Sequence, residues 1–277
     1  MYIPLIVNEI LRFALQEDAG HGDITTSYLI PEKSKSKAHF IAKERFILAG
    51  LPFVGEVFHI LDSTAVLRPF YNDGARIKRG DIIAELSAKT HAILMGERVG
   101  LNLVQRLSGI ATLTNIYVDR IKDLKAKITD TRKTTPCLRF MEKYAVKVGG
   151  GYNHRFGLYD GILVKDNHIT VTGSVRKAVK KAKMGHHLSR IEVEVRTLKE
   201  VKEAIEEGAD ILMLDNMSLD DMRAAVKIAK GRTLIEASGN VNLGNVRAVA
   251  ETGVDLISIG ALTHSAFSVD ISLKIVK

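Results

Sequence analysis

The segment from residue 131 to residue 168 holds an unusual density of cationic side chains and glycines. It contains Thr131-Arg132-Lys133, then Gly149-Gly150-Gly151-Tyr152-Asn153-His154-Arg155, then Lys165-Asp166-Asn167-His168. An arginine fork grips a carboxylate or phosphate at two points, lysine adds a point charge, and glycine lets backbone N–H groups approach the same oxygens. The pattern predicts a site for a small molecule that carries phosphate, carboxylate or both.

Two acidic residues, Glu194 and Asp215, end neighbouring predicted strands. Two carboxylates on one rim can hold Mg²⁺, directly or through water, with substrate phosphates as further ligands. Alternatively, the carboxylates of Glu194 and Asp215 neutralise the cationic side chains of residues 131–168. Lys165, at another strand end, could bind a carboxylate, form a Schiff base or pair with Glu194. Glu192 is expected to point to the opposite face and to be structural.

Two further motifs, Ser238-Gly239-Asn240 and Ser258-Ile259-Gly260-Ala261, each follow a late strand and precede a helix. In barrels, the loops after the last strands often form a phosphate site at helix N-termini. Either motif alone would be read as an ordinary cap, but two in succession predict phosphate binding. His154 and Arg155 follow the glycine run on a loop, where substrate contact is expected.

The elements that must position these residues begin near residue 127, where short apolar strands start to alternate with helices. Strands are predicted at 128–130, 162–164, 191–194, 211–214, 234–237 and 256–259, each running into a polar residue. Such units predict a parallel barrel whose strand ends converge on one mouth. A full eight-fold barrel needs about 250 residues, so an incomplete or irregular barrel is expected.

The first hundred residues predict a mixed α and β unit. We expect residues 1–20 to form an amphipathic helix rather than a signal peptide, with an apolar stripe of Ile6, Ile10, Phe13 and Ala14. Strands are expected at 38–42 and 65–70, and 82–86 pairs with 91–94 as a hairpin. A long helix starts near residue 96, with Leu101, Val104 and Leu107 directed inward.

Composition narrows the class of protein. The 277 residues carry 40 Lys and Arg against 32 Asp and Glu, a net charge of +8. Trp is absent and no nucleic-acid-binding motif appears, so an acidic metabolite fits the charge better than nucleic acid. No uncharged run reaches membrane-spanning length, which predicts a soluble protein. The single Cys137 excludes an intrachain disulfide and a cysteine-cluster metal site, as expected of the reducing cytoplasm, and predicts a half-buried side chain after Pro136.

Together the segments resemble the quinolinate phosphoribosyltransferase family over nearly the whole chain. The resemblance rests on ordered motifs: Glu17-Asp18 through Gly22-Asp23-Ile24-Thr25-Thr26, Glu97-Arg98-Val99 with Leu101-Asn102, residues 108–112, 130–134 and 153–155, Lys165-Asp166-Asn167-His168, Glu192-Val193-Glu194-Val195, Leu214-Asp215-Asn216 and residues 260–264. It implies an α/β fold with an N-terminal α/β sandwich-like domain at 1–108. It also implies an irregular, incomplete (β/α) barrel at 109–264 that is catalytic, with a C-terminal tail from about 265 to 277 that packs back on the first domain.

The implied activity is phosphoribosyl transfer from phosphoribosyl pyrophosphate (PRPP) to quinolinate with decarboxylation, giving nicotinate mononucleotide, pyrophosphate and CO₂ for NAD biosynthesis. The enzyme would be a nicotinate-nucleotide diphosphorylase (carboxylating), a pentosyltransferase that uses Mg²⁺. It would work as a homodimer, or a higher oligomer built from it, whose sites are shared between subunits. Arg98 would then act across the interface.

The resemblance also implies roles for individual residues. The catalytic residues would be Lys165, Glu194 and Asp215, and the metal ligands Glu194 and Asp215. The substrate-binding residues would be Arg98, Thr131, Arg132, Lys133, His154, Arg155, Lys165, Glu194 and Asp215. The phosphate-binding residues would be Ser238, Gly239, Asn240, Ile259, Gly260 and Ala261.

Three positions depart from the usual family pattern. Cys137 and Asn240 stand where glycine is common, and Arg196 stands where an acidic or small polar residue is common. Asn tolerates left-handed backbone, so the phosphate loop can survive, whereas Arg196 could shift specificity near Glu194. One alternative is a paralogous phosphoribosyltransferase, such as the ModD-type proteins, acting on another acid. A binding protein on a decayed barrel would have lost Glu194, Asp215 or Lys165, and all three are present.

Overall fold

The computed structural model describes residues 3–185 and 188–276, which form two compact units. The first comprises residues 1–113, 135–149 and 266–277, and the second comprises 114–134 and 150–265. Helix α4 (Thr90–Arg120) contributes to both units, so the predicted boundary after residue 108 lies inside a helix. Residues 135–149, expected in the barrel, group with the first unit.

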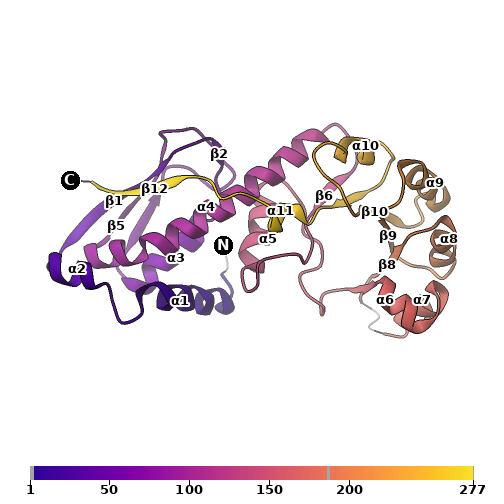
Figure 1. The fold of residues 1–277 in the computed structure, drawn as a ribbon, viewed down its shortest axis with the longest axis horizontal. Helices are drawn as coiled ribbons and strands as arrows, with labels where there is room; N and C mark the ends of the chain where they lie inside the picture. Colours follow the sequence, from indigo (N-terminus) through magenta and orange to yellow (C-terminus); the bar gives the residue numbers. More distant parts are fainter. Residues whose placement is uncertain (1–2, 186–187, 277) are drawn as a thin grey trace. The chain divides into compact units, whose positions relative to one another are not determined.

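The first unit contains a four-stranded antiparallel sheet in the order β12-β1-β5-β3 (Figure 1). These strands are β12 (Ile271–Val276), β1 (Lys35–Ala42), β5 (Ile82–Lys89) and β3 (Val66–Pro69). The C-terminal strand β12 pairs with β1 from Lys37 opposite Val276 to Ala42 opposite Ile271. A second, two-stranded sheet pairs β2 (Phe46–Ile47) with β4 (Arg76–Ile77). Every second residue of β1, beginning at Ala38, is buried, as expected for a strand with one face on the core.

The first unit also contains several helices. They are α1 (Leu5–Ala19), α2 (Ile24–Leu29), α3 (Leu51–Leu61), the first part of α4, and α5 (Arg139–Val148). Phe58 of α3 meets Phe40 of β1 edge to face, with ring centroids 6.3 Å apart. Leu101 and Val104 of α4 are buried in the same cluster, as predicted.

The predicted face of the first helix is wrong for Ile6 and Phe13, whereas Ile10 and Ala14 are half-buried. Val7, Leu11 and Leu15 are buried, whereas Ile6 and Phe13 are 56% and 75% exposed. Both stripes repeat at helical spacing, and only packing against the rest of the unit decides which one turns inward. An apolar face therefore remains on the surface.

The predicted hairpin is also wrong, because β5 runs to Lys89 and α4 begins at Thr90. Residues 91–94 belong to the helix, where Ile93 is buried on the same side as Leu101. A short apolar run does not distinguish a buried strand from a buried helical turn. Cys137 is exposed rather than half-buried, and its φ of 66° explains why glycine suits that position.

The second unit is built on six parallel strands in the order β6-β11-β10-β9-β8-β7, and all six predicted strands are present. They are β6 (Lys127–Thr129), β7 (Ile162–Val164), β8 (Ile191–Val195), β9 (Ile211–Asp215), β10 (Leu234–Ser238) and β11 (Leu256–Ser258). The helices between and after them are α6 (Asp166–Thr172), α7 (Val175–Lys183), α8 (Leu198–Glu206), α9 (Leu219–Ala229), α10 (Val246–Ala250) and α11 (Ala261–His264). Within the described residues, no ladder joins β7 to β6, so this α/β sheet stays open, in agreement with the predicted incomplete barrel.

The parallel register brings the polar strand ends to one edge. Ser238 lies opposite Asp215, and Glu194 lies opposite Met213, two residues before Asp215 on β9. Because all six strands run the same way, their carboxyl ends and the loops that follow share this edge. Among the helices of residues 3–185 and 188–276, none combines the length and apolar character needed to cross a bilayer.

Candidate active site

A cavity of about 810 Å³ opens at the carboxyl ends of the strands, wholly within the second unit. This volume suits a small-molecule ligand. Its lining includes every predicted site residue of that unit: Thr131, Arg132, Lys133, His154, Arg155, Lys165, Glu194, Asp215, Ser238, Gly239, Asn240, Ile259, Gly260 and Ala261. Arg98, the remaining predicted residue, is exposed on α4 in the first unit.

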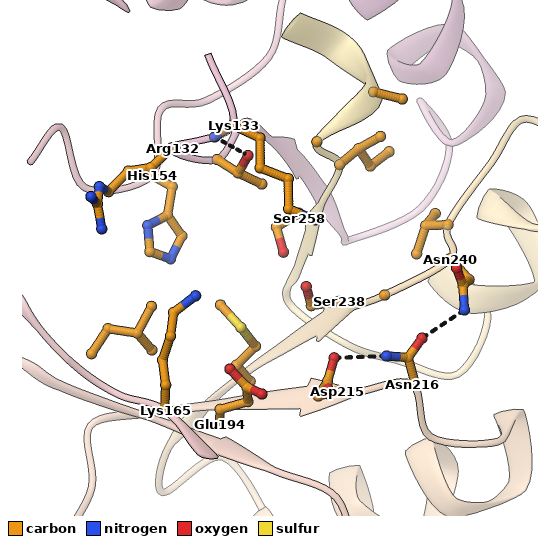
Figure 2. Close-up of a pocket in the computed structure, with 18 of the residues that line it drawn as sticks. Arg132, Lys133, His154, Lys165, Glu194, Asp215, Asn216, Ser238, Asn240 and Ser258 are labelled. Carbon is orange, nitrogen blue, oxygen red and sulfur yellow. Dashed lines mark hydrogen bonds between the residues drawn. The ribbon is translucent and has the colours of Figure 1, made fainter. Parts of the chain in front are cut away.

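The loop after β6 supplies a cationic wall. The backbone N–H of Lys133 donates to Oγ1 of Thr131 at 3.0 Å, and Oγ1 of Thr263 donates to the carbonyl of Lys133 at 2.8 Å. These bonds hold the loop against α11. A Cβ added at Gly260 would lie 2.9 Å from Cδ of Lys133, so glycine allows this close approach. Figure 2 shows Arg132, Lys133 and His154 together on one side of the cavity.

Arg155 adds a second, partly buried guanidinium. It donates from Nη1 to the carbonyl of Gly161 at 2.8 Å, and its Nε is buried without a hydrogen-bond partner among the described residues. Burial, and then the charge of Arg132, lower its pKa from the usual value. Two guanidinium groups that repel each other at the cavity wall favour an anion between or beside them.

The opposite wall carries the acids and Lys165. Glu194 and Asp215 lie at the ends of adjacent strands, and the Lys165 ammonium points into the cavity beside them (Figure 2). Burial and then the charge of Asp215 raise the pKa of Glu194, while Lys165 and Arg196 oppose that rise. The acid pair is therefore stabilised by a nearby cation, and hard carboxylate oxygens are the donors that Mg²⁺ prefers.

Arg196 lies between these acids. Its Nε donates to Oδ2 of Asp215 at 3.0 Å and its Nη2 donates to Oδ2 of Asp166 at 3.1 Å. The same Nη2 is 3.5 Å from Oε1 of Glu194. The unusual residue thus contacts both predicted metal ligands.

The loop after β10 has the backbone of a phosphate-binding turn. Gly239 has φ 92° and Asn240 has φ 51°, so asparagine does adopt the left-handed conformation here. Nδ2 of Asn240 donates to Oδ1 of Asn216, whose own Nδ2 donates to Oδ1 of Asp215, both at 2.9 Å. A Cβ at Gly239 would overlap the Asn216 amide. The phosphate loop and the acid pair are therefore linked through Asn216.

Sequence reasoning gave Asn216 no individual role, although it lines the cavity and has φ 55°. An asparagine directly after a strand-ending aspartate was the available signal, since asparagine tolerates left-handed backbone. Met213, which also lines the cavity, gave no signal beyond an apolar strand residue.

The expected orientation of Glu192 is wrong, although its contact with His154 agrees with the structural role that was expected. Residues two apart on a strand share a face, so Glu192 and Glu194 point the same way. Nε2 of His154 lies 2.9 Å from Oε2 of the buried Glu192 and 3.7 Å from Oε1 of Glu236. Burial, and then the charge of Glu192, raise the pKa of Glu236 to about 7. Two buried carboxylates therefore share one imidazole.

The tautomer of His154 follows from its other nitrogen. The backbone N–H of Arg155 donates to Nδ1 at 2.8 Å, so the neutral ring carries its proton on Nε2 and donates to Glu192. The three side chains are close enough to surround a metal, with ligand atoms within 4.8 Å of one another. However, a metal bound to Nε2 would require a proton on Nδ1. Nδ1 already accepts a hydrogen bond from the backbone N–H of Arg155, so it carries no proton and the arrangement does not suit a metal. This arrangement suits a hydrogen-bonded support for the Arg155 loop.

Comparisons with known proteins give a consistent result. Residues 23–108 match the family described as quinolinate phosphoribosyl transferase, N-terminal domain, and residues 110–274 match its C-terminal domain. A Bacillus subtilis protein named "Probable nicotinate-nucleotide pyrophosphorylase (carboxylating)" is 46% identical over 98% of this chain and 94% of its own length. An Arabidopsis thaliana protein named nicotinate-nucleotide pyrophosphorylase (carboxylating), chloroplastic, is 42% identical over 96% and 82%. The crystal structure of NadC from Streptococcus pyogenes superposes with a TM-score of 0.94 at 41% identity, covering 100% of this chain and 99% of that one.

Proposed function

The chain belongs to the quinolinate phosphoribosyltransferase family, and we propose that the cavity of its second unit transfers the phosphoribosyl group of PRPP to quinolinate with decarboxylation. The products are nicotinate mononucleotide, pyrophosphate and CO₂, which makes the protein a nicotinate-nucleotide pyrophosphorylase (carboxylating) of NAD biosynthesis. One observation carries the assignment to this cavity: a cationic wall, an acid pair and a left-handed phosphate loop all line it.

The cationic wall suits quinolinate, the acceptor of the phosphoribosyl group. Quinolinate carries two carboxylates, and Arg132, Lys133, Arg155 and Lys165 offer the forks and point charges that bind such groups. Arg155 is held in place by its bond to Gly161 and by the support of His154 on Glu192. The role of His154 is therefore to position Arg155, in addition to any contact of its ring with substrate.

The wall that carries Glu194 and Asp215 suits PRPP, the donor of the phosphoribosyl group. When the ring nitrogen of quinolinate attacks C1 of the ribose, the bond to diphosphate breaks and positive charge builds on the sugar. Glu194 and Asp215 favour that positive charge electrostatically. The same two carboxylates would hold Mg²⁺, whose chemistry there is to neutralise the departing pyrophosphate. Ser238, Gly239 and Asn240, with the facing residues 259–261, would bind the 5-phosphate through loop N–H groups.

Loss of CO₂ from the adduct leaves an electron pair on the ring carbon beside the alkylated nitrogen, and a proton then takes the place of CO₂. The cationic ring nitrogen absorbs much of this charge. The protein's part is to orient the adduct and exclude water, and Lys165 and Arg155 both line the cavity where they can do so.

We also propose that the protein is a homodimer, in which Arg98 of the partner subunit completes the site. The support is a set of large exposed apolar side chains on the first unit, carried by α1 and α2: Leu5, Ile6, Phe13, Ile24, Tyr28 and Leu29. So many exposed apolar side chains favour burial at an association surface. The single, exposed Cys137 is compatible with a reducing compartment such as the cytoplasm.

The reaction is tested by supplying PRPP and Mg²⁺ with quinolinate and nicotinate in separate assays. Pyrophosphate and nicotinate mononucleotide are expected with quinolinate alone, because the second carboxylate is both a binding group and the leaving group. Absence of turnover with both acids, from folded protein, would overturn the assignment and point to a paralogue with another acceptor.

A further inference from the structure

Arg196 contacts three carboxylates that all line the active-site cavity. The partners are Asp215, Asp166 and Glu194, at 3.0, 3.1 and 3.5 Å. Asp215 ends β9, Glu194 lies on β8, and Asp166 begins α6 just after β7. One guanidinium therefore contacts all three carboxylates, in addition to the positive charge that Lys165 places near Glu194.

The backbone of Arg196 is fixed, but its side chain is not packed. Its N–H donates to Oε2 of Glu200 at 2.7 Å, and Glu200 forms a capping box with Thr197 at the start of α8. The side chain is 55% exposed, and the contacts described above join it to carboxylates only. It can therefore turn into solvent by side-chain rotation without opening a cavity in the core.

The Arg196 guanidinium and a divalent cation would interact with the same two carboxylates, those of Asp215 and Glu194. Oδ1 of Asp215 accepts from Asn216 and Oδ2 accepts from Arg196, so both of its oxygens already have a donor. A cation bound to Asp215 and Glu194 would lie beside the guanidinium, and two positive charges a few ångströms apart repel. Occupancy by one disfavours occupancy by the other.

We propose that Arg196 is an internal counter-ion that competes with Mg²⁺ for Glu194 and Asp215. It neutralises the acid pair when no substrate is present and turns away when the metal binds. This inference rests on the proposed function, because it takes Glu194 and Asp215 as the metal ligands. It assigns Arg196 a role in metal binding rather than in the choice of acid substrate.

Mn²⁺ binding to the substrate-free protein tests the proposal without reference to activity. Mn²⁺ accepts the same oxygen ligands as Mg²⁺, and its free fraction can be followed by electron paramagnetic resonance. Arg196→Ala is expected to bind Mn²⁺ at least about tenfold more tightly than the wild type, because a neighbouring positive charge is removed. Arg196→Lys, which keeps the charge but loses the fork, should lie between them. Arg223→Ala is the matched control, since it removes an exposed arginine that pairs with Asp220 on α9, away from the cavity lining.

Equal or weaker Mn²⁺ binding in folded Arg196→Ala would overturn the proposal. The added substitution Asp215→Asn must remove the gain in affinity, and a gain that survives it would also overturn the proposal by placing the ion elsewhere. Turnover with quinolinate is measured on the same wild-type preparation. Turnover without the expected Mn²⁺ pattern overturns the counter-ion role and leaves the transferase assignment intact. The expected pattern without turnover supports competition at the acids and overturns the assigned reaction.

Discussion

The Nε2 atom of His154 lies 2.9 Å from Oε2 of Glu192, which stands two residues before the cavity-lining Glu194 on β8. Glu236 approaches the same nitrogen at 3.7 Å and is 1% exposed. The two carboxylates share one donor, so one of them is best accommodated with a proton. Burial, and then the charge of Glu192, raise the pKa of Glu236 to about 7, which favours a proton on this carboxylate.

Glu236 should make stability depend on pH. Its pKa is higher in the folded protein than its ordinary value of 4.5, so the folded state binds this proton more tightly. Its contribution to stability is full below about pH 4.5 and is lost as the pH rises through about 7. We expect Glu236→Gln to be more stable than the wild type at about pH 8 and not at about pH 5, by urea unfolding.

The exposed Glu251→Gln serves as the control, since Glu251 pairs with Arg247 on the surface at the end of α10. Parallel stability curves for wild type and Glu236→Gln between those two pH values would show that Glu236 does not hold the proton.

Arg132 should carry much of the binding of the anionic acceptor. Truncation to alanine removes a charged partner from a carboxylate or phosphate in the cavity, and such bonds are worth about 3 kcal/mol. The expected result for Arg132→Ala is a fall of about 100-fold in kcat/KM for quinolinate, measured by steady-state kinetics.

Arg232→Ala is the matched control, because Arg232 is an exposed arginine of the same unit that donates to the carbonyl of Ile228. Near-normal kcat/KM in Arg132→Ala would refute the placement of the acceptor at this wall.

The second unit could be predicted well from sequence because its signals are local. Each buried parallel strand is a short apolar run, and a polar residue directly after it must lie at the shared carboxyl edge. That rule was sufficient to bring Glu194, Asp215 and Ser238 to one cavity.

The first unit and the side-chain network depend on tertiary contacts. The apolar residues of α1 form two stripes, and packing selected the one with Val7 and Leu11. The bridge formed by Arg196 depends on its rotamer, and the role of Asn216 depends on a left-handed backbone. Neither property can be read from the spacing of residues. Glu192 could have been placed correctly, since the two-residue period of a strand puts it on the face of Glu194.

We expect the phosphate loop to need glycine at position 239 for two reasons, its backbone conformation and the lack of space for a side chain. Its φ of 92° strains any other residue, and a Cβ there would also displace the Asn216 amide that joins Asn240 to Asp215. We expect Gly239→Ala to raise KM for PRPP at least about tenfold, on the scale of one lost charge-assisted hydrogen bond.

Gly231→Ala separates strain from the clash, because Gly231 has φ 73° and open space where its Cβ would lie. Both variants should lose about 1 kcal/mol of stability through the left-handed backbone, but only Gly239→Ala should affect PRPP. Equal KM values for the two variants would remove the case for a phosphate site at this loop.

A shared site predicts that two inactive variants restore activity when mixed. Arg98 is exposed on α4 of the first unit, and Lys165 lines the cavity of the second unit. If Arg98 of the partner subunit completes each cavity, an Arg98→Ala subunit paired with a Lys165→Ala subunit has one site with both residues intact and one site with neither. Random exchange of equal amounts makes half of the dimers mixed, with one active site of two, so about a quarter of wild-type activity is expected if dimers form without preference. Subunit exchange must be shown independently, for example by energy transfer between labelled subunits.

As a control, Arg98→Ala mixed with itself should stay inactive. Demonstrated exchange without recovery would mean that Arg98 does not act across an interface, whereas recovery to about a quarter would support a homodimer with sites shared between subunits.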